Sequence, residues 1–333
     1  MSKTNVHVLI ATLLLGVLLI VVRQIGGDAE VEPLEVPTPQ AAESQDADAA
    51  AEAPAAAAPA GRAAPVQLTS SADLQALLDA RGLNGANLLD ASAEWFRQRG
   101  FNGPQPLLGV AAGNTPEDYF ASLDDETLRS LSEAGDAGAT LSLGMRVALT
   151  DSFAALDLFK KAVEQGGSAA LLQIASQRET FSYFNLSDYD TDPEFARRLR
   201  VLSRSSPDRL LADAFVYASV AIRDSGEPIV DEQLLDWLDS LKGRLSDTRR
   251  SRICERSFGQ YVNMGMARRN AGLPPVNFDA PPVFLALPDL DERLPCNDTN
   301  SPIASTLDLS ACSIEPVFDD LGRERMLYIC AQP

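Results

Sequence analysis

The chain has 333 residues, of which 47 are acidic and 28 basic, and it carries a formal net charge of −19 with a pI of about 4.4. Nucleic-acid binders present a basic face, so this charge argues against a nucleic-acid partner. The single histidine, His7, lies in an apolar N-terminal run. Because the rest of the chain has no histidine, it cannot form a Ser-His-Asp triad, a Cys-His pair or a zinc site that needs histidine. Catalysis by carboxylates, by a Ser-Lys pair or by a tyrosine acid remains possible.

Residues 1–27 contain an apolar run from Val6 to Val22. A run of about 17 residues is at the short end of what crosses a bilayer as a helix. A cleaved signal peptide and an uncleaved signal anchor are the two alternatives. Arg23 follows the run directly, and the residues after it offer only a poor cleavage site, which favours an anchor formed by one transmembrane helix.

Residues 28–66 combine alanine and proline with many acidic side chains. The acidic residues are Asp28, Glu30, Glu32, Glu35, Glu43, Asp46, Asp48 and Glu52. Such a stretch has too few large apolar side chains to offset the entropy of ordering, so the sequence predicts a disordered, self-repelling linker. Helix formation in its alanine runs is limited by Pro54, Pro59 and Pro65.

The cysteines indicate an oxidising compartment. All four lie in the last quarter of the chain, without CxxC spacing: Cys254, Cys296, Cys312 and Cys330. An even number at such spacing is typical of disulfides. The segment before the apolar run carries Lys3, whereas the segment after it carries Arg23 and then an acidic tract. This difference in charge favours a cytoplasmic N-terminus. The composition is rich in arginine and alanine, which is typical of GC-rich bacterial genomes. Together, the cysteines, the charge difference and this composition predict a single-pass protein of a bacterial inner membrane with a periplasmic C-terminal domain.

Residues 67–270 are predicted to form a helical domain. Three segments share a helix-start pattern of a capping residue, proline and an acidic residue: Thr115-Pro116-Glu117, Asp192-Pro193-Glu194 and Ser206-Pro207-Asp208. Elsewhere apolar residues recur at spacings of three and four, as in amphipathic helices. No alternating, strand-like pattern precedes about residue 280. We therefore expect an array of short antiparallel helices.

Within this array, residues 128–175 have the pattern of a helical hairpin. Gly135 can end one helix and Asp136 can begin the next, whose small-residue face contains Ala139, Leu143 and Gly144. A facing stripe is formed by Ala155, Leu158, Phe159 and Ala162, before Gly166 ends the second helix. Small residues on one helix let the large residues of the other pack closely.

This segment resembles Sel1-like repeats, which are relatives of the tetratricopeptide repeat. The matching residues are Ala137, Ala139, Leu143, Gly144, Ala155, Phe159, Lys161, Ala162 and Gly166, whereas Val163 stands where alanine is usual. The resemblance covers one repeat and a half. It implies a solenoid-like concave surface for binding another protein, with neighbouring helices acting as degenerate repeats or caps. The alternative is an ordinary helical domain that contains one such hairpin.

Residues 271–333 are predicted to form a separate C-terminal module. Repeated prolines after Leu273 predict an ordered loop or an extended strap. After it, a β-hairpin is expected with a three-residue loop, Asp320-Leu321-Gly322, which places Cys312 opposite Cys330. This register favours disulfides Cys312–Cys330 and Cys254–Cys296 among three possible pairings. A two-residue loop would shift the register, and a four-cysteine zinc site is the remaining alternative.

The candidate binding residues are arginines. One cluster contains Arg197, Arg198, Arg200, Arg204 and Arg209. A second contains Arg244, Arg249, Arg250, Arg252, Arg256, Arg268 and Arg269. On an acidic protein, local basic surface can dock an acidic partner, a lipid headgroup or an anionic cell-wall polymer. The alternative is that these arginines pair with neighbouring acidic residues and helix C-termini. We select Arg249, Arg250, Arg252 and Arg256 as the candidate partner site.

The sequence favours a non-catalytic role. It predicts no cofactor and no metal site, and the main hypothesis is a membrane-anchored periplasmic scaffold or adaptor that binds another envelope protein. One alternative is a glycan-binding protein or a carboxylate-dependent peptidoglycan hydrolase, which would need a deep cleft with two facing carboxylates, one of them with a raised pKa. The other alternative is a purely structural spacer in the envelope.

Overall fold

The computed structural model describes residues 66–101, 120–184, 193–203, 206–270, 272–273 and 279–330. These residues belong to one unit that spans Arg62–Pro333. None of the helices in these ranges is long and apolar enough to cross a membrane. The predicted transmembrane run at 6–22 and the predicted linker up to residue 65 lie outside the described residues.

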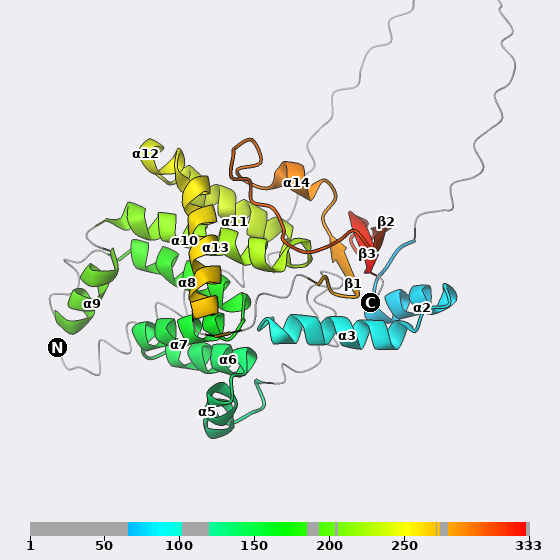
Figure 1. Ribbon diagram of the computed structural model, residues 1–333, viewed down its shortest axis with the longest axis horizontal. Helices are drawn as coiled ribbons and strands as arrows, with labels where there is room; N and C mark the ends of the chain where they lie inside the picture. The colour runs from blue at the N-terminus through cyan, green and yellow to red at the C-terminus, as the bar shows by residue number, and fades with distance from the viewer. Residues whose placement is uncertain are drawn as a thin grey trace, which may run out of the picture. The chain divides into compact units, whose positions relative to one another are not determined.

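The described part of the chain is mainly helical, as predicted (Figure 1). Its α-helices are α2 (Ser71–Ala80), α3 (Gly85–Gln98), α5 (Asp125–Glu133), α6 (Ala137–Ala148), α7 (Ser152–Glu164), α8 (Ala169–Ser182), α9 (Pro193–Ser203), α10 (Pro207–Ser225), α11 (Glu232–Gly243), α12 (Asp247–Arg250), α13 (Ile253–Asn270) and α14 (Leu290–Arg293). A short 3₁₀ helix, η2 (Glu227–Ile229), follows α10. The strands are β1 (Val283–Ala286), β2 (Cys312–Phe318) and β3 (Glu324–Cys330).

Several helices begin where the sequence predicts. Helix α10 begins at Pro207, directly after Ser206, and α9 begins at Pro193. Helix α6 is preceded by Asp136, whose carboxylate accepts a hydrogen bond from the Ala139 N–H at 2.9 Å. The third predicted start, Thr115-Pro116-Glu117, lies outside the described residues. At α6 the capping residue thus sets the helix boundary through a contact with its near neighbours in the sequence.

Helices α6 and α7 form the predicted hairpin. Gly135, with φ +97°, precedes the cap of α6, and Gly166, with φ +105°, follows α7. Gly144 of α6 faces Phe159 of α7 so closely that a Cβ on Gly144 would lie 2.6 Å from the Phe159 Cε1 atom. Phe159 is buried. The small-residue face and the facing stripe therefore pack together as the sequence indicates.

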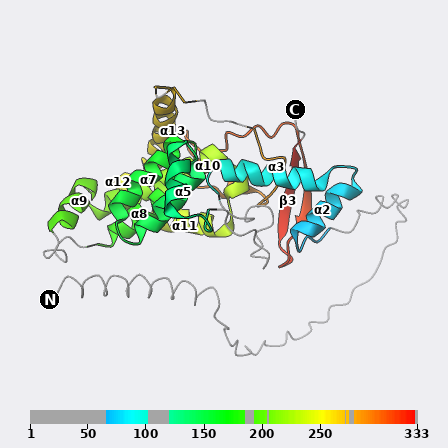
Figure 2. The same ribbon diagram turned by 90° about the horizontal axis from the view of Figure 1, so that it is seen from below.

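Helix α10 is the centre of the helical part. Every residue from Ala218 to Ser225 is buried. Its apolar side chains share one core with residues of α8, α11 and α13, and this core also includes Leu290 and Leu294 near α14. Helix α13 packs on the outside of this array: Figure 1 shows it crossing in front of α10 and α8, and Figure 2 shows it at the edge of the helices. One side of α13 therefore packs on the array while the opposite side faces solvent.

The strands form one antiparallel sheet in the order β1-β3-β2. The hairpin has the predicted register: Cys312 is opposite Cys330, the Asp319 N–H donates to the Arg323 carbonyl at 2.9 Å, and Gly322 has φ +71°. Strand β1 was not predicted. The sequence analysis expected a loop or strap in this region, but residues 283–286 pair with β3 along their whole length. The prolines before this short run allow an extended strand to begin.

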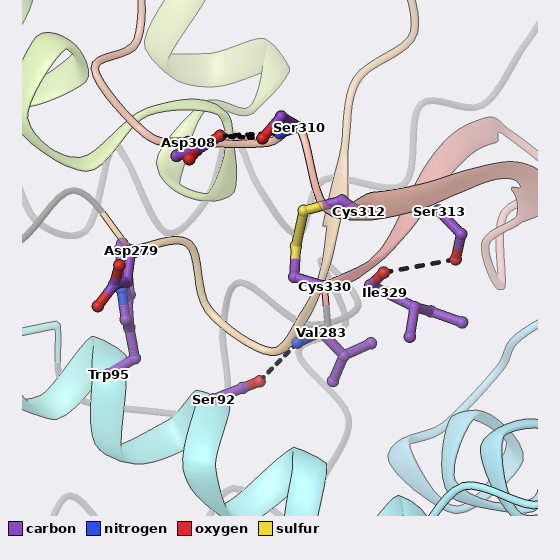
Figure 3. The surroundings of a disulfide bond; sticks show 10 residues. All are labelled: Ser92, Trp95, Asp279, Val283, Asp308, Ser310, Cys312, Ser313, Ile329 and Cys330. Atoms are coloured by element: carbon purple, nitrogen blue, oxygen red, sulfur yellow. Dashed lines mark hydrogen bonds between the residues drawn. A yellow bond between two sulfur atoms is a disulfide. The ribbon is translucent and has the colours of Figure 1, made fainter. Parts of the chain in front are cut away.

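The sheet does not form a core by itself. Its side chains Val283, Leu285 and Leu327 pack with Leu74 and Leu78 of α2. Helix α3 adds two polar contacts: Ser92 Oγ accepts from the Val283 N–H at 2.9 Å, and Trp95 Nε1 donates to the Asp279 carbonyl at 2.7 Å (Figure 3). The C-terminal strands and the first described helices thus fold as one assembly.

The two disulfides join the pairs that the predicted register favours. Cys312–Cys330 bridges β2 and β3 (Figure 3), and Cys254–Cys296 links the first turn of α13 to the segment after α14. All four cysteines are bonded in this way. The alternative of a four-cysteine zinc site is therefore wrong, because no thiolate remains to bind a metal.

Candidate functional site

The four predicted partner-binding arginines lie on α12 and the beginning of α13, but they differ in their contacts. Arg249 Nε donates to Asp208 Oδ2 at 2.5 Å, and Arg256 pairs with Asp213. Arg250 donates to main-chain carbonyls at the end of α11 and just after it, with Nη2 at 2.9 Å from the Leu245 oxygen. In the described structure, the exposed Arg252 guanidinium has no hydrogen-bond or ion-pair partner. Arg250 therefore has a structural contact, while Arg252 is free to bind a ligand.

Three of these arginines line a groove between α10, α12 and α13. One cavity of about 610 Å³ is lined by residues of these helices and of the turn before α12: Asp208, Arg209, Ala212, Ser246, Thr248, Arg249, Arg252, Ile253 and Arg256. An adjoining cavity of about 320 Å³ is lined by Arg178, Val201, Leu202, Arg209, Asp213, Val216, Tyr217, Arg256 and Gln260. Arg209 and Arg256 line both cavities, so the two lie side by side, and we call them together the basic groove.

Arg178 lies at the buried end of the basic groove. It comes from α8, it is only 8% exposed, and its Nε has no hydrogen-bond partner. Its nearest acidic neighbour is Asp213, at 4.0 Å between Nη1 and Oδ2. A buried guanidinium with an unused donor is costly unless a partner satisfies it. The Arg178 side chain lines the smaller cavity and adds positive charge there, while its Nε is itself buried.

Arg209 is, after Arg252, the second arginine of the basic groove that has no partner among the described residues. It is half-buried near the beginning of α10, and within the described ranges its guanidinium makes no hydrogen bond or ion pair. Arg209 and Arg252 together face the larger cavity. Because guanidinium groups match carboxylate and phosphate oxygens with two parallel hydrogen bonds, this pair suits an anionic ligand.

The acidic residues of the basic groove are already engaged. Burial raises the pKa of Asp208, but hydrogen bonds from the Ser246 backbone and hydroxyl and from Arg249 outweigh that effect, so the pKa lies below its ordinary value. Asp213 is held by Arg178 and Arg256. Five arginines against two aspartates leave an excess of three positive charges (5 − 2 = 3) in the basic groove. This excess stands out on a chain whose net charge is −19.

Sequence reasoning found only part of this site. Arg209 was assigned to the first arginine cluster, yet α10 places it beside the second. Arg178 was not predicted, and the only signal in the sequence is its position as a lone cation among the buried residues of α8. The partners Asp208 and Asp213 precede Arg249 and Arg256 by 41 and 43 positions. Only the tertiary fold brings these residues together.

The geometry that a carboxylate-based hydrolase needs is not found in the basic groove. Burial raises the pKa of Asp224 and Glu227, but neither carboxyl group lines either cavity. Asp224 instead accepts a hydrogen bond from the Ser168 hydroxyl in the core between α8 and α10. Among the described residues there is also no group of three His, Cys, Asp or Glu side chains placed to hold a metal ion.

No protein-family model, no curated protein sequence and no solved structure matches this chain.

Proposed function

We propose that this chain is a non-catalytic adaptor of the cell envelope, and that its basic groove binds an acidic segment of another envelope protein. The observation that carries the proposal is that two arginines of one groove, Arg209 and Arg252, have no partner among the described residues, and that the buried Arg178 adds a further positive charge beside them. Guanidinium groups that the fold itself leaves unpaired are available to a ligand.

The lining of the basic groove favours a peptide over a purely anionic polymer. Val201 and Leu202 lie beside Arg178 and Arg209 in the smaller cavity, and Val201 is exposed. A peptide can place apolar side chains against them while its carboxylates reach the arginines, whereas a polyphosphate or a teichoic-type polymer has nothing apolar to offer. Two adjoining cavities also suit an extended segment better than a single small anion.

The setting of this function is also a proposal. Two disulfides near the C-terminus support an oxidising compartment. An N-terminal signal anchor at residues 6–22 would then hold the folded unit on the periplasmic side of a bacterial inner membrane, with residues 28–66 as the linker. The resemblance of residues 128–175 to a Sel1-like repeat is consistent with a role in protein binding.

The test is crosslinking in intact cells, followed by capture of the full-length chain. The variant is Arg209→Ser with Arg252→Ser. The matched control is Arg129→Ser with Arg197→Ser, which removes the same charge from exposed helical surface outside the basic groove. We expect one envelope protein with an acidic segment to be captured by the wild type and the control and lost from the groove variant.

A direct binding measurement accompanies the capture. A fluorescent peptide with the sequence of the captured acidic segment should bind the purified full-length chain more weakly as salt rises, because the contact is electrostatic. Purified peptidoglycan and anionic lipid vesicles serve as competing probes. If the groove variant keeps its partner, or if only the polymer or the vesicles bind, the proposal of an acidic protein partner is wrong.

A further inference from the structure

The solvent-facing side of α13 carries an exposed apolar stripe, and at one end of it the Phe258 ring lies 5.4 Å from the Arg223 guanidinium of α10. Phe258, Val262 and Met266 are spaced by four residues, and they are 47%, 40% and 41% exposed. Residues four apart on a helix lie on the same face. Single exposed apolar side chains are common, but a row of three large ones along one helix is typical of an interaction surface.

Two glycines flank the centre of this stripe. Gly259 and Gly265 each lie three positions from Val262, and a Cβ at either would have no heavy atom within 4 Å. Packing against the rest of this chain therefore does not require these glycines, although glycine in a helix interior is destabilising. Small residues on an outer helix face allow another helix to approach closely.

A charged residue lies at each end of the apolar stripe on α13. Glu255 and Arg269 each lie seven positions from Val262, on opposite sides of it, and both are exposed. Neither side chain makes an ion pair or a hydrogen bond within the described part of the chain. Spacings of three, four and seven keep the stripe, the glycines and these two charges on one side of the helix.

The order of residues on this face is symmetric about Val262. When two copies of α13 pack antiparallel with a two-fold axis at Val262, Gly259 meets Met266 on one flank, Phe258 meets Gly265 on the other, and Glu255 meets Arg269. Each contact occurs twice, as a two-fold interface requires. The two Val262 side chains then meet on the axis, each large side chain packs over a glycine of the other copy, and opposite charges meet at both ends.

We propose that this face of α13 is a homodimer interface, with a second copy of the same chain as its occupant. The basic groove uses a different row of α13, the one that contains Arg252, Arg256 and Gln260. The inference is therefore independent of the acidic partner. Each dimer would present two basic grooves.

The interface formed by α13 alone is small. A helix of 18 residues is about 27 Å long and buries less than the ~800 Å² per partner that a stable interface usually has. We therefore expect a weak dimer in dilute solution, which covalent trapping detects better than a sizing column does.

The first test is cysteine trapping in the full-length chain. Val262→Cys introduces a single free thiol, because all four native cysteines are in disulfides. Mild oxidation of intact cells should convert this variant into a covalent dimer of the chain on a non-reducing gel. The control is Ala267→Cys, an exposed position of α13 that lies off the symmetric face, and it should stay monomeric.

Charge reversal then tests the orientation of the two helices. In the Val262→Cys background, Glu255→Arg alone or Arg269→Glu alone should reduce trapping several-fold, because each puts like charges opposite each other. The two changes together should restore it. If Val262→Cys perturbs the fold, a mixture of Gly259→Cys and Met266→Cys chains replaces it and should form the mixed dimer.

Three results would overturn the proposal. The first is no dimer from Val262→Cys or from the mixture of Gly259→Cys and Met266→Cys chains. The second is equal trapping of Ala267→Cys. The third is a covalent product whose mass corresponds to this chain joined to a different protein.

Discussion

Asp319 and Arg325 form an ion pair beneath the turn that closes the β2–β3 hairpin, with Arg325 Nε donating to Asp319 Oδ2 at 3.2 Å. The Asp319 side chain has no exposed surface, and it also accepts from the Arg323 N–H and Nε, each at 2.8 Å. Burial raises the pKa of Asp319, but these hydrogen bonds outweigh that effect and hold the pKa below its ordinary value. The buried carboxylate thus organises the turn.

Replacing Asp319 by Asn should destabilise the protein. Arg325 is itself buried and would lose its charged partner, so we expect the free energy of unfolding at pH 7 to fall by on the order of 3 kcal/mol. Because the folded pKa of Asp319 is depressed, this contribution is present above about pH 4 and is lost as the pH falls through the folded pKa. In urea unfolding measured at several pH values, the difference in free energy of unfolding between wild type and Asp319→Asn should therefore become smaller as the pH falls below about 4.

The matched control for this prediction is Asp320→Asn, in the same turn. Asp320 is exposed and makes no ion pair in the described structure, so its replacement should leave the free energy of unfolding within about 0.5 kcal/mol of wild type. A gap for Asp319→Asn that stays constant from pH 7 to pH 3 would contradict the assigned role of its charge.

Asp224 should have the opposite pH dependence. Burial raises its pKa, and the Ser168 hydroxyl together with the charges of Arg99 and Arg268 offsets this only in part. A raised folded pKa means that the folded state holds the proton more tightly, so the wild type loses stability as the pH rises from about 4 through the folded pKa. Asp224→Asn cannot titrate, and its stability relative to wild type should increase over this range.

Chemical unfolding between pH 4 and pH 8 checks the Asp224 prediction. Asp247→Asn is the control, since the Asp247 side chain is fully exposed. Parallel curves for wild type and Asp224→Asn would show that Asp224 titrates as an ordinary carboxylate.

Gly144→Ala tests the close contact between α6 and α7. The new methyl group would press on the ring of Phe159, which is fully buried. Overpacking costs more than the helix propensity of alanine provides, so we expect a net loss of about 1–2 kcal/mol in the free energy of unfolding. Gly243→Ala, where a Cβ meets nothing within 4 Å, should be neutral or slightly stabilising. Equal results for both variants in urea unfolding would rule out a packing role for Gly144.

Removal of either disulfide should destabilise the fold through loop entropy. Cys254→Ser with Cys296→Ser opens a loop with a sequence separation of 42, and Cys312→Ser with Cys330→Ser opens one of 18. The chain-entropy relation gives losses of about 4 and about 3 kcal/mol, respectively. Thermal unfolding of both double variants, compared with reduced wild type, measures these losses. An unchanged midpoint after reduction would contradict this expectation.

Local signals in the sequence were sufficient for much of the fold. The cap at Asp136, the start of α10 at Pro207 and the hairpin register around Gly322 each depend on a few neighbouring residues. Strand β1 could not be found in this way. Its four residues are all buried and show no alternation, and their partner in the sheet, β3, lies about 40 positions later in the chain.

The candidate site was predictable only in composition. The sequence shows that arginines gather near residues 249–256, but not which of them the fold will neutralise. Asp208 and Asp213 approach Arg249 and Arg256 because α10 packs against α13. Among the residues that the structure describes, the same packing leaves Arg252 without a partner, and it adds Arg178 from α8. Distant contacts therefore decide which cations remain available.

The Cys254–Cys296 bond turns the segment between its two cysteines into a covalent ring that contains α13 and β1. A protease that cuts the backbone after Arg268 or Arg269 would open this ring without separating the two fragments. They would migrate as one species until a reductant broke the bond. The outermost helix of the array is thus secured against a single cleavage, and only the combination of a cut and a reducing environment would release the C-terminal strands from the polypeptide that precedes them.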